Sequence, residues 1–476
     1  MVYKPSVYLV SAAVALVTLQ MDQVTSSSLA FDPFTTCNSY NIGDESFPGR
    51  GTEIPDDGNC VVTLPLAPNV PPMPSAVSPM SVLDTSLLSK AAVSPSEPVF
   101  TKVGTQLMSE ETPTTGADQD ELEWTSEDDI TTLEKYFGKT MELKLKNLPT
   151  KAVYKPSAWA GSNWPVYQDS INYTWNKRQP SPAEKYAKVF GLDVTKFMNA
   201  VSANNGVDSK AKNLKCTINK EGYDPKVDTV CAKRAGKQSG CCILTWYGIY
   251  HAWAPASILE KEPNCPVTFN GVTFQPMDIK ALVTDVYDDA QISTVFTGSR
   301  YNNYEDSIVA YGGHTDYSYR DLNPGSFHIA ATNLLGLLTT TFIIDRDAGT
   351  EVWNQPVVGF KEAANTFFGV GSYDYWDPNA TSIVYVKSRL SWINETLADG
   401  GLYTVGAYYD YLLGLDDTEE IIGGEWLYES NNNHPDFLWL ATGKPAATTV
   451  TSIGLKYADV TMLLEKAVAC SGTHSP

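Results

Sequence analysis

The amino-acid sequence predicts an α+β protein, in which helices come first along the chain and an antiparallel sheet follows. Helix start signals and helical spacing of apolar residues concentrate between residues 121 and 240. Short runs of β-branched and aromatic residues, separated by turn residues, recur between residues 266 and 411. Helices followed by strands, without regular alternation of the two, are typical of the α+β class.

The chain of 476 residues divides into four predicted parts. Residues 1–30 are expected to be a secretory signal peptide, because their apolar run, Val7–Leu19, is too short to span a bilayer. Residues 31–120 are rich in Pro, Ser, Thr and Asp, which predicts a linker or pro-region, with a mucin-like stalk as the alternative. We expect a helical domain at 121–240 and the main core at 241–476.

Charge and cysteine content predict the compartment and restrict the partners. The excess of 55 Asp and Glu over 34 Lys and Arg argues against nucleic acid or an anionic membrane as a partner. All eight cysteines lie beyond the signal peptide, and an even count in a secreted chain predicts four disulfides, with Cys37–Cys60 as a local pair. Three Asn-x-Ser/Thr motifs predict glycosylated surface loops at Asn172, Asn379 and Asn394. Together these features predict a secreted, extracellular protein.

Three helices are predicted before residue 240. Residues 126–137 combine an acidic cap with apolar residues at helical spacing. Residues 181–191 begin with a capping box and a proline at the first helical position, and they end at a glycine. A third helix is expected over residues 193–201. The aromatic segment 159–175 is expected to be irregular and packed on the core.

The central stretch is Thr245–Glu260, TWYGIYHAWAPASILE, which is predicted to be a turn that opens into a helix. Gly248 supplies backbone freedom, and Pro255 is expected in the first turns, where a missing N–H costs least. A Gly-x-nucleophile-His-Ala order at a helix start resembles the active site of papain-like enzymes, in which the helix N-terminus stabilises a cysteine thiolate. Tyr250 occupies that nucleophile position here. A buried aromatic helix without chemistry is the alternative interpretation.

The second half of the chain is predicted to form the antiparallel sheet. Asn270-Gly271, between β-branched and aromatic residues, predicts a hairpin over residues 266–274. Further strands are expected at residues 307–311, 327–334, 339–345, 381–390 and 402–411.

A base and its orienting partner are predicted within this sheet. If residues 327–345 form a hairpin that turns at Gly336-Leu337, His328 lies directly opposite Asp345. Opposed residues share a face with Cβ atoms roughly 4.5–5.5 Å apart, at which distance an Asp can hold an imidazole in one tautomer. His434, in a polar Asn-rich turn, is the rival base. The alternative is that His328 is a structural side chain.

Several segments resemble one family, the oomycete transglutaminase elicitors. Glu351–Lys361 (EVWNQPVVGFK) closely resembles the peptide elicitor segment of these proteins. Similar stretches are Trp246–Pro255, Val267–Ile279, Asp345–Glu351 and Gly423–Trp439, so that the resemblance covers roughly Trp124 to Trp439.

The resemblance implies a secreted, calcium-dependent protein-glutamine γ-glutamyltransferase with a papain-like core. Such an acyltransferase joins protein glutamine and lysine side chains through a thioester, and plants recognise its peptide segment, which makes a plant surface receptor an expected partner. By position, His328 would be the general base and Asp345 its orienting partner, with Asn354 and Asp347 as secondary candidates. The backbone N–H at the nucleophile position would help to bind the oxyanion. The elicitor residues carried over are Val352, Trp353, Asn354, Gln355, Pro356, Val357, Gly359, Phe360 and Lys361, with Trp353 and Pro356 as anchors.

Two residues depart from the family pattern. The family's cysteine is expected at position 250, and a phenol with a pKa of about 10 is a poor acyl-transfer nucleophile. Val358 stands where the family peptide carries Arg. A catalytically silent relative, or pseudoenzyme, is therefore one hypothesis. The others are an active enzyme that uses Cys241 or Cys242, and a structural protein of a wall or matrix.

The sequence does not support calcium independently of the family. EF-hand spacing is absent. The acidic clusters Asp416–Glu420 and Asp285/Asp288/Asp289 are interpreted as solvated charges rather than as metal ligands.

Overall fold

The computed structural model describes residues 129–217, 229–290, 292–298, 322–346, 351–369, 381–397, 404–426, 430 and 433–470. The predicted signal peptide and linker, the Cys37–Cys60 pair, the strand expected at 307–311, Asp347 and Asn379 lie outside these residues. None of the described helices is long and apolar enough to cross a membrane. The predicted α+β class is confirmed, since the described chain combines helices with an antiparallel sheet.

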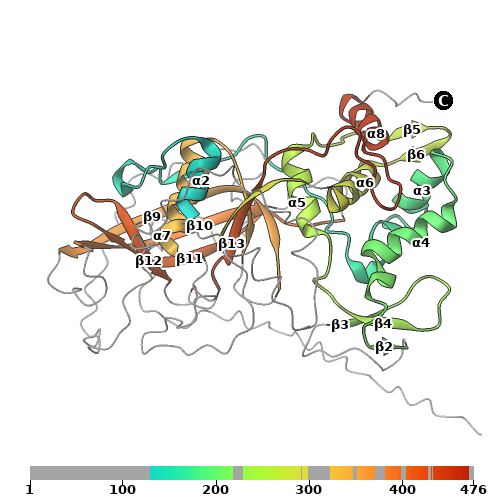
Figure 1. The fold of residues 1–476 in the computed structure, drawn as a ribbon, viewed down its shortest axis with the longest axis horizontal. Coiled ribbons are helices and arrows are strands. Elements are labelled where there is room, and N and C mark those ends of the chain that lie inside the picture. Colours follow the sequence, from blue (N-terminus) through green and yellow to red (C-terminus); the bar gives the residue numbers. More distant parts are fainter. Residues whose placement is uncertain are drawn as a thin grey trace, which may run out of the picture.

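A large antiparallel sheet forms one half of the molecule (Figure 1). Its strand order is β12-β11-β10-β9-β8-β13-β7, and β1 pairs with β9 outside this path. The strands are β1 (Lys151–Val153), β7 (Thr294–Gly298), β8 (Ile343–Asp345), β9 (Asn354–Gly369), β10 (Ser382–Ile393), β11 (Thr404–Leu415), β12 (Ile421–Trp426) and β13 (Phe437–Ala441). The strands expected at 381–390 and 402–411 are thus confirmed as parts of β10 and β11.

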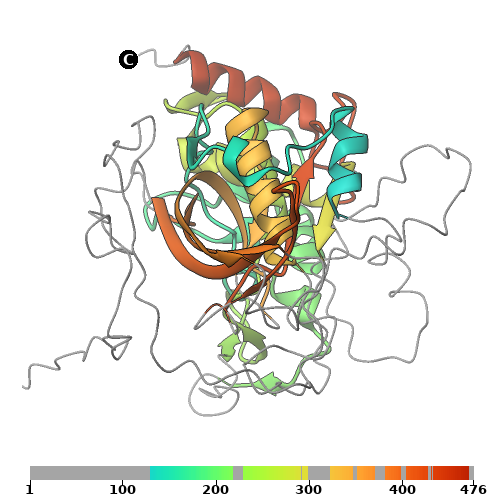
Figure 2. The same ribbon diagram turned by 90° about the vertical axis from the view of Figure 1, so that its left-hand side faces the viewer.

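The long strands of the sheet curve around helix α7 (Pro324–Ala331), which lies on their concave side (Figure 2). Phe327 of α7 packs against three aromatic rings of the sheet. The ring centroids of Tyr409, Tyr411 and Trp426 lie 5.7, 6.0 and 5.5 Å from its own. Helix α2 (Asp129–Phe137) packs beside α7 and β7. The apolar core of this half is therefore enclosed between the sheet and these helices.

The other half of the molecule is mainly helical (Figure 1). It contains α3 (Pro182–Val189), α4 (Val194–Asn205), α5 (Tyr250–Leu259), α6 (Pro276–Asp289) and α8 (Tyr457–Ala469), with the hairpin of β5 (Val267–Phe269) and β6 (Val272–Phe274). One apolar core joins them and includes Trp159, Tyr186, Trp253 and Leu463. Helix α5 contacts α6 on one side and β9 on the other, so it connects the two halves. The domain boundary at residue 240 stays a prediction.

Short elements complete the described chain. A small sheet has the order β2 (Lys215–Cys216), β4 (Gly240–Leu244), β3 (Thr229–Ala232), and β4 leads into α5. Single turns of 3₁₀-helix lie at Leu145–Asn147, Val166–Gln168, Ser170–Asn172 and Val207–Lys210, and a π-helical turn lies at Thr332–Leu337.

Two disulfides lie within the described chain. One joins Cys216 of β2 to Cys231 of β3, and the other joins Cys265 to Cys470 beyond the end of α8. Cys241 and Cys242 carry free thiols. The expectation that all eight cysteines are paired is therefore wrong for these two.

The local signals for helices and turns are largely confirmed. The three helices expected before residue 240 are α2, α3 and α4. The Ser181 side chain accepts a hydrogen bond from the N–H of Glu184 at 3.2 Å, as a cap should. Asn270 and Gly271 have φ angles of 48° and 76°, both positive, as a two-residue type I′ turn requires. Segment 159–175 is irregular with buried tryptophans, as expected.

The strand predicted at residues 327–334 is wrong, because these residues belong to α7 and the π-helical turn. The Asn323 side chain accepts a hydrogen bond from the N–H of Gly325 at 2.8 Å, and Pro324 occupies the first helical turn. All residues of α7 are buried, so no polar face marks a helical period in the sequence. The predicted hairpin over residues 327–345 is therefore wrong as well.

Helix α6 and strand β9, which both contact α5, were not predicted from the sequence. Helix α6 begins with a capping box, in which Gln275 is the cap and Asp278 the returning side chain, with Pro276 at the first position. Strand β9 contains most of the elicitor-like segment, from Asn354 onward, for which the sequence predicted a recognition peptide and no strand.

The turn before α5 lies very close to the segment that contains Asn163. The Ile249 N–H donates to the Asn163 carbonyl oxygen at 2.7 Å. A Cβ on Gly248 would lie 2.4 Å from Asn163 Nδ2 and 2.8 Å from the carbonyl oxygen of that residue. Glycine is therefore required at position 248 because the Asn163 segment leaves no room for a Cβ atom. The reason expected from the sequence was conformational freedom of the backbone.

We expect Gly248→Ala to lower the free energy of unfolding by about 1–3 kcal/mol, because Asn163 must move to admit the methyl group. Gly443→Ala is the matched control, since no heavy atom lies within 4 Å of a Cβ there. Its free energy of unfolding should change by no more than about 0.5 kcal/mol. Urea unfolding measures both variants, and equal losses would contradict the steric explanation.

Candidate active site

Helix α5 begins at Tyr250, so the predicted turn-to-helix transition is confirmed. Ile249 is the N-cap residue, and its carbonyl oxygen accepts a hydrogen bond from the Trp253 N–H at 3.0 Å. Pro255 lies inside the helix rather than in its first turn, so its expected position is wrong. The N-terminus of the helix, with Tyr250, meets the start of β9, where the two halves of the molecule join.

The Tyr250 side chain is enclosed and hydrogen-bonded. The residue is 2% exposed, and its hydroxyl donates to Glu395 Oε1 at 3.2 Å. Gln355 Nε2 donates to the second carboxylate oxygen of Glu395, also at 3.2 Å. The Trp353 ring packs edge-on against the Tyr250 ring, with centroids 5.5 Å apart. These four residues, which we call the Tyr250 group, form the candidate site.

The environment keeps the Tyr250 phenol neutral. Burial raises the pKa of Tyr250 well above its usual value, and the nearby Glu395 carboxylate raises the pKa further. A neutral phenol that donates a hydrogen bond to a carboxylate is a poor nucleophile. The group as built therefore holds the start of α5 against the start of β9.

Asp345 and Arg346 lie beside the Tyr250 group. Asp345, at the end of β8, is fully buried, and its Oδ1 accepts a hydrogen bond from the Trp353 backbone N–H at 2.8 Å. The Arg346 guanidinium lies over the Trp353 ring, 5.1 Å from the centroid. Its positive charge opposes part of the rise in the pKa of Tyr250. Asp345 is thus linked to the Tyr250 group through Trp353, and its role as an orienting partner stays a prediction.

His328 lies in the core of the sheet, on α7. Its Nδ1 is 2.9 Å from the Tyr411 hydroxyl and 3.4 Å from Glu362 Oε2, and burial lowers its pKa to about 3. The predicted opposition of His328 and Asp345 is wrong, because Asp345 is paired with Asn354 across β8 and β9. The register that would oppose His328 and Asp345 is therefore absent, and the general-base role of His328 stays a prediction.

The secondary candidates for the base and its partner have structural contacts. His434 lies stacked on Trp426, and its Nδ1 is 2.8 Å from the Ser430 carbonyl oxygen. Asn354 Oδ1 accepts a hydrogen bond from Trp439 Nε1 at 2.7 Å. Among the described residues, no imidazole contacts the Tyr250 hydroxyl.

His251 follows Tyr250 but faces α6. Its Nε2 lies 2.9 Å from Asp288 Oδ1. Asn205 Nδ2 donates to Asp285 Oδ1 at 2.7 Å and to Asp288 Oδ2 at 2.9 Å. Burial, and then the Asp288 charge, raises the pKa of Asp285 to about 7. Asp285 and Asp288 are 1% and 8% exposed, so their interpretation as solvated charges is wrong.

The residues that the structure describes provide no cluster of side chains suited to a calcium ion. Within the described ranges, no group of three or more His, Cys, Asp or Glu side chains could hold a metal ion. In the second acidic cluster, Asp416 Oδ1 accepts hydrogen bonds from two backbone N–H groups of its own loop at 2.9 Å. Calcium ligands are therefore not assigned.

The elicitor-like segment is built into β9. Its buried members are Val352, Asn354, Gln355, Pro356, Val357, Val358, Gly359 and Phe360, while Trp353 and Lys361 are half-buried. Its backbone pairs with β8, β10 and β1. Val358 is the residue skipped by the pairing with β10, so it forms a bulge. It packs into the helical core, whereas Val357 packs into the sheet core.

The glycosylation motifs differ in exposure. Asn172 is 8% exposed, and its Nδ2 donates to the Met198 carbonyl oxygen at 2.8 Å and to Asp169 Oδ2 at 3.1 Å. The predicted surface position is therefore wrong for Asn172. Asn394 is half-buried just beyond β10, in the segment that carries Glu395.

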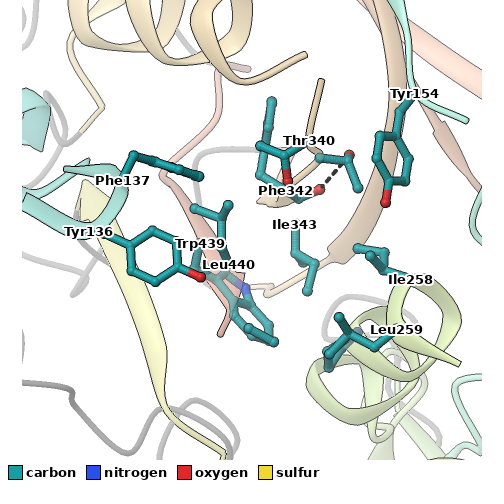
Figure 3. Close-up of a pocket in the computed structure, with 13 residues that line it drawn as sticks. Tyr136, Phe137, Tyr154, Ile258, Leu259, Thr340, Phe342, Ile343, Trp439 and Leu440 are labelled. Carbon is teal, nitrogen blue, oxygen red and sulfur yellow. Dashed lines mark hydrogen bonds between the residues drawn. The ribbon is translucent and has the colours of Figure 1, made fainter. Parts of the chain in front are cut away.

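A pocket of about 100 Å³, partly open to solvent, lies at the opposite end of α5 (Figure 3). Figure 3 shows Ile258 and Leu259 of α5 on one side, with Tyr136 and Phe137 of α2 on the other. Trp439 and strand residues beside it complete the wall. The pocket does not include Tyr250 and is separate from the candidate site.

Glu395 was not identified from the sequence. It lies 145 positions after Tyr250, and no motif connects the two. Only the packing of α5 against the sheet brings them together. Gln355 was named as an elicitor residue, and its contact with Glu395 is a second role that the sequence did not indicate.

Comparisons with known proteins support the family resemblance. Residues 129–470 match a family model described as transglutaminase elicitor. The crystal structure of the GP42 transglutaminase from Phytophthora sojae is similar, with 53% sequence identity and a TM-score of 0.65. The similarity covers 72% of this chain and 98% of that chain. No curated protein matches the chain.

Glu362, beside His328, predicts a pH dependence of stability. Its side chain is 2% exposed, and burial raises its pKa from 4.5 to about 8. The folded state therefore binds this proton more tightly than the unfolded state, so the free energy of unfolding should fall as pH rises from 4.5 to about 8.

We expect Glu362→Gln to flatten this dependence, because glutamine carries no proton to lose. The slope removed is at most about 1.4 kcal/mol per pH unit. Urea unfolding of wild type and variant at intervals between pH 5 and pH 8 measures it. An unchanged slope in the variant would contradict the assignment to Glu362.

Proposed function

Because the chain belongs to the transglutaminase elicitor family, we propose that it is a secreted transglutaminase-type protein whose acyl-transfer chemistry is silenced at Tyr250. The observation that carries this proposal is the Tyr250 group. The side chain at the nucleophile position is buried, neutral and hydrogen-bonded to Glu395.

Acyl transfer between glutamine and lysine needs a nucleophile that Tyr250 does not supply. A thiolate attacks the glutamine carboxamide, ammonia leaves, and the thioester then passes its acyl group to the lysine amine. In a papain-like core, the thiolate would lie at the helix N-terminus, where the helix dipole stabilises it. The position of Tyr250 at the start of α5, against an antiparallel sheet, supports such a core.

The proposed lack of acyl-transfer activity involves other residues besides Tyr250. Among the described histidines, His251 contacts Asp288, His328 contacts Tyr411 and His434 contacts Ser430, so none of these imidazoles contacts the Tyr250 hydroxyl. Cys241 and Cys242 are poor replacements for the missing thiol. Both are buried on β4, and burial raises the pKa of Cys242.

A non-catalytic protein on this scaffold would bind partners instead of modifying them. Proteins that present glutamine or lysine side chains are the proposed ligands, by the family's chemistry. A plant surface receptor remains a proposed partner. Because most of the elicitor-like segment is buried in β9, we propose that a receptor reads it after unfolding or cleavage.

Secretion is also part of the proposal. Two disulfides in the described chain suit an oxidising compartment, since cytosolic proteins rarely keep such bonds. Calcium dependence is proposed from the family alone, without assigned ligands.

The test is incorporation of a primary amine into a glutamine donor, with calcium present, by wild type, Tyr250→Cys and Tyr250→Phe. We expect no incorporation above background by wild type. Tyr250→Cys should raise the rate at least about tenfold, because a thiol at the helix N-terminus can form a thioester.

Tyr250→Phe is the matched control, since it keeps the ring and removes only the hydroxyl. It should remain silent. Wild-type activity equal to that of Tyr250→Cys would contradict the proposal. A folded but silent Tyr250→Cys would place the loss in the base as well as in the nucleophile.

A further inference from the structure

Three cysteines share one face of the small sheet formed by β2, β4 and β3. The pairing places Cys216 opposite Gly240, and Cys231 opposite Cys242. Directly opposed residues share a face, and residues two apart on a strand share it too. Cys216, Cys231 and Cys242 therefore lie on one face.

Cys241 lies on the other face. It opposes Lys215 and Ala232, and Lys215 Nζ lies 3.3 Å from its Sγ. Cys241, Ala232 and Ile243 also pack into one apolar core. The two adjacent free thiols thus have different surroundings.

Gly240 allows the Cys216–Cys231 disulfide to form across β4. In a flat sheet, β2 and β3 would be separated by two strand spacings, or roughly 9.5 Å. The Cα atoms of Cys216 and Cys231 are 5.8 Å apart, so the sheet folds over β4 at this point. A Cβ on Gly240 would lie 1.9 Å from the Ala232 carbonyl oxygen, which shows how tight the fold is.

We propose that Cys231 has two alternative disulfide partners, Cys216 and Cys242, and that the small sheet is a thiol–disulfide switch. Directly opposed residues of an antiparallel pair have Cα atoms about 4.5–5.5 Å apart. This range lies within the Cα separations of about 4.4–6.8 Å that disulfides accept. Cys231 can therefore bond either cysteine without a large backbone movement.

The exchange is balanced within the chain. The Cys242 thiolate attacks the Cys231 sulfur, the Cys231–Cys242 bond forms, and the Cys216–Cys231 bond breaks. Cys216 leaves as a thiolate and takes up the proton that Cys242 lost, so no external oxidant is needed. Burial and the neighbouring Cys241 raise the pKa of Cys242. The exchange should therefore be slow at neutral pH, and its rate should rise about tenfold for each unit by which the pH increases toward that pKa.

The switch lies directly upstream of the candidate site. The Cys216–Cys231 bond ties the two outer strands to each other, whereas Cys231–Cys242 would fasten β3 to β4. Strand β4 ends at Leu244, and α5 begins at Tyr250. The exchange would thus change which strand is covalently fixed immediately before the helix that carries the Tyr250 group.

Disulfide mapping of Cys216→Ser tests the proposal directly. The chain is alkylated under native conditions, in oxidised glutathione, and then digested and analysed by mass spectrometry. Cys241→Ser is included in the same chain, because the two adjacent cysteines share a peptide. We expect a Cys231–Cys242 linkage. Recovery of Cys231 as an alkylated thiol in the folded variant would overturn the proposal.

A second measurement does not depend on the folding of Cys216→Ser. The chain with Cys241→Ser alone is incubated at pH 8.5 with a trace of reduced glutathione, then acid-quenched and mapped. We expect alkylated Cys216 together with Cys231–Cys242, in amounts that grow about tenfold faster than at pH 7.5. Adding Cys242→Ser should abolish both products. Cys216 found only in the bond to Cys231 would overturn the proposal.

Discussion

The pairing of β9 on both of its edges is the constraint on which the rest of the structure depends. Along one edge, β9 forms antiparallel pairs with β8 and then with β1, and along the other edge it pairs with β10. It also contacts the helix that carries Tyr250. Consecutive residues of a regular strand face opposite sides, and a bulge lets the chain redirect one of them. At Val357 and Val358, this places neighbouring side chains in the two separate cores of the molecule.

The candidate site follows from this junction. Gln355 and Trp353, at the start of the strand, come within reach of Tyr250, while Glu395 arrives from the segment after β10. Glu395 is half-buried, and a carboxylate partly withdrawn from water is stabilised by hydrogen bonds to its oxygens. The phenol and the amide each satisfy one oxygen of Glu395. The candidate site is thus a hydrogen-bonded cluster in which the Tyr250 hydroxyl is a structural donor.

Local chemistry made much of the fold predictable from the sequence. The cap at Ser181 and the Asn270-Gly271 turn act within a few residues, so their structures were predicted correctly. Helix α7 was mistaken for a strand because it is buried on every side, which removes the polar face that reveals a helical period. Its start at Asn323-Pro324 was the signal that could have identified it.

The site was predictable only in part, for a different reason. The start of α5 at Tyr250 could be predicted because a helix start has its own sequence signature. Glu395 and Arg346 could not, since their contacts depend on how the sheet packs on α5. The pairing of His328 with Asp345 failed because it required a hairpin register, and the helix at 324–331 removes the hairpin.

The burial of α5 determines how position 250 can be reached at all. Eight consecutive residues from Tyr250 are buried, so the helix has no solvent-facing side in its first two turns. Rotation of one side chain therefore cannot open a path to this position. A substrate or a modifying reagent reaches position 250 only if side chains packed on the start of α5, such as Trp353 of the segment before β9, move aside. Access to position 250 is thus controlled by the free energy needed to separate these packed side chains. A ligand that holds them together would also block access to this position.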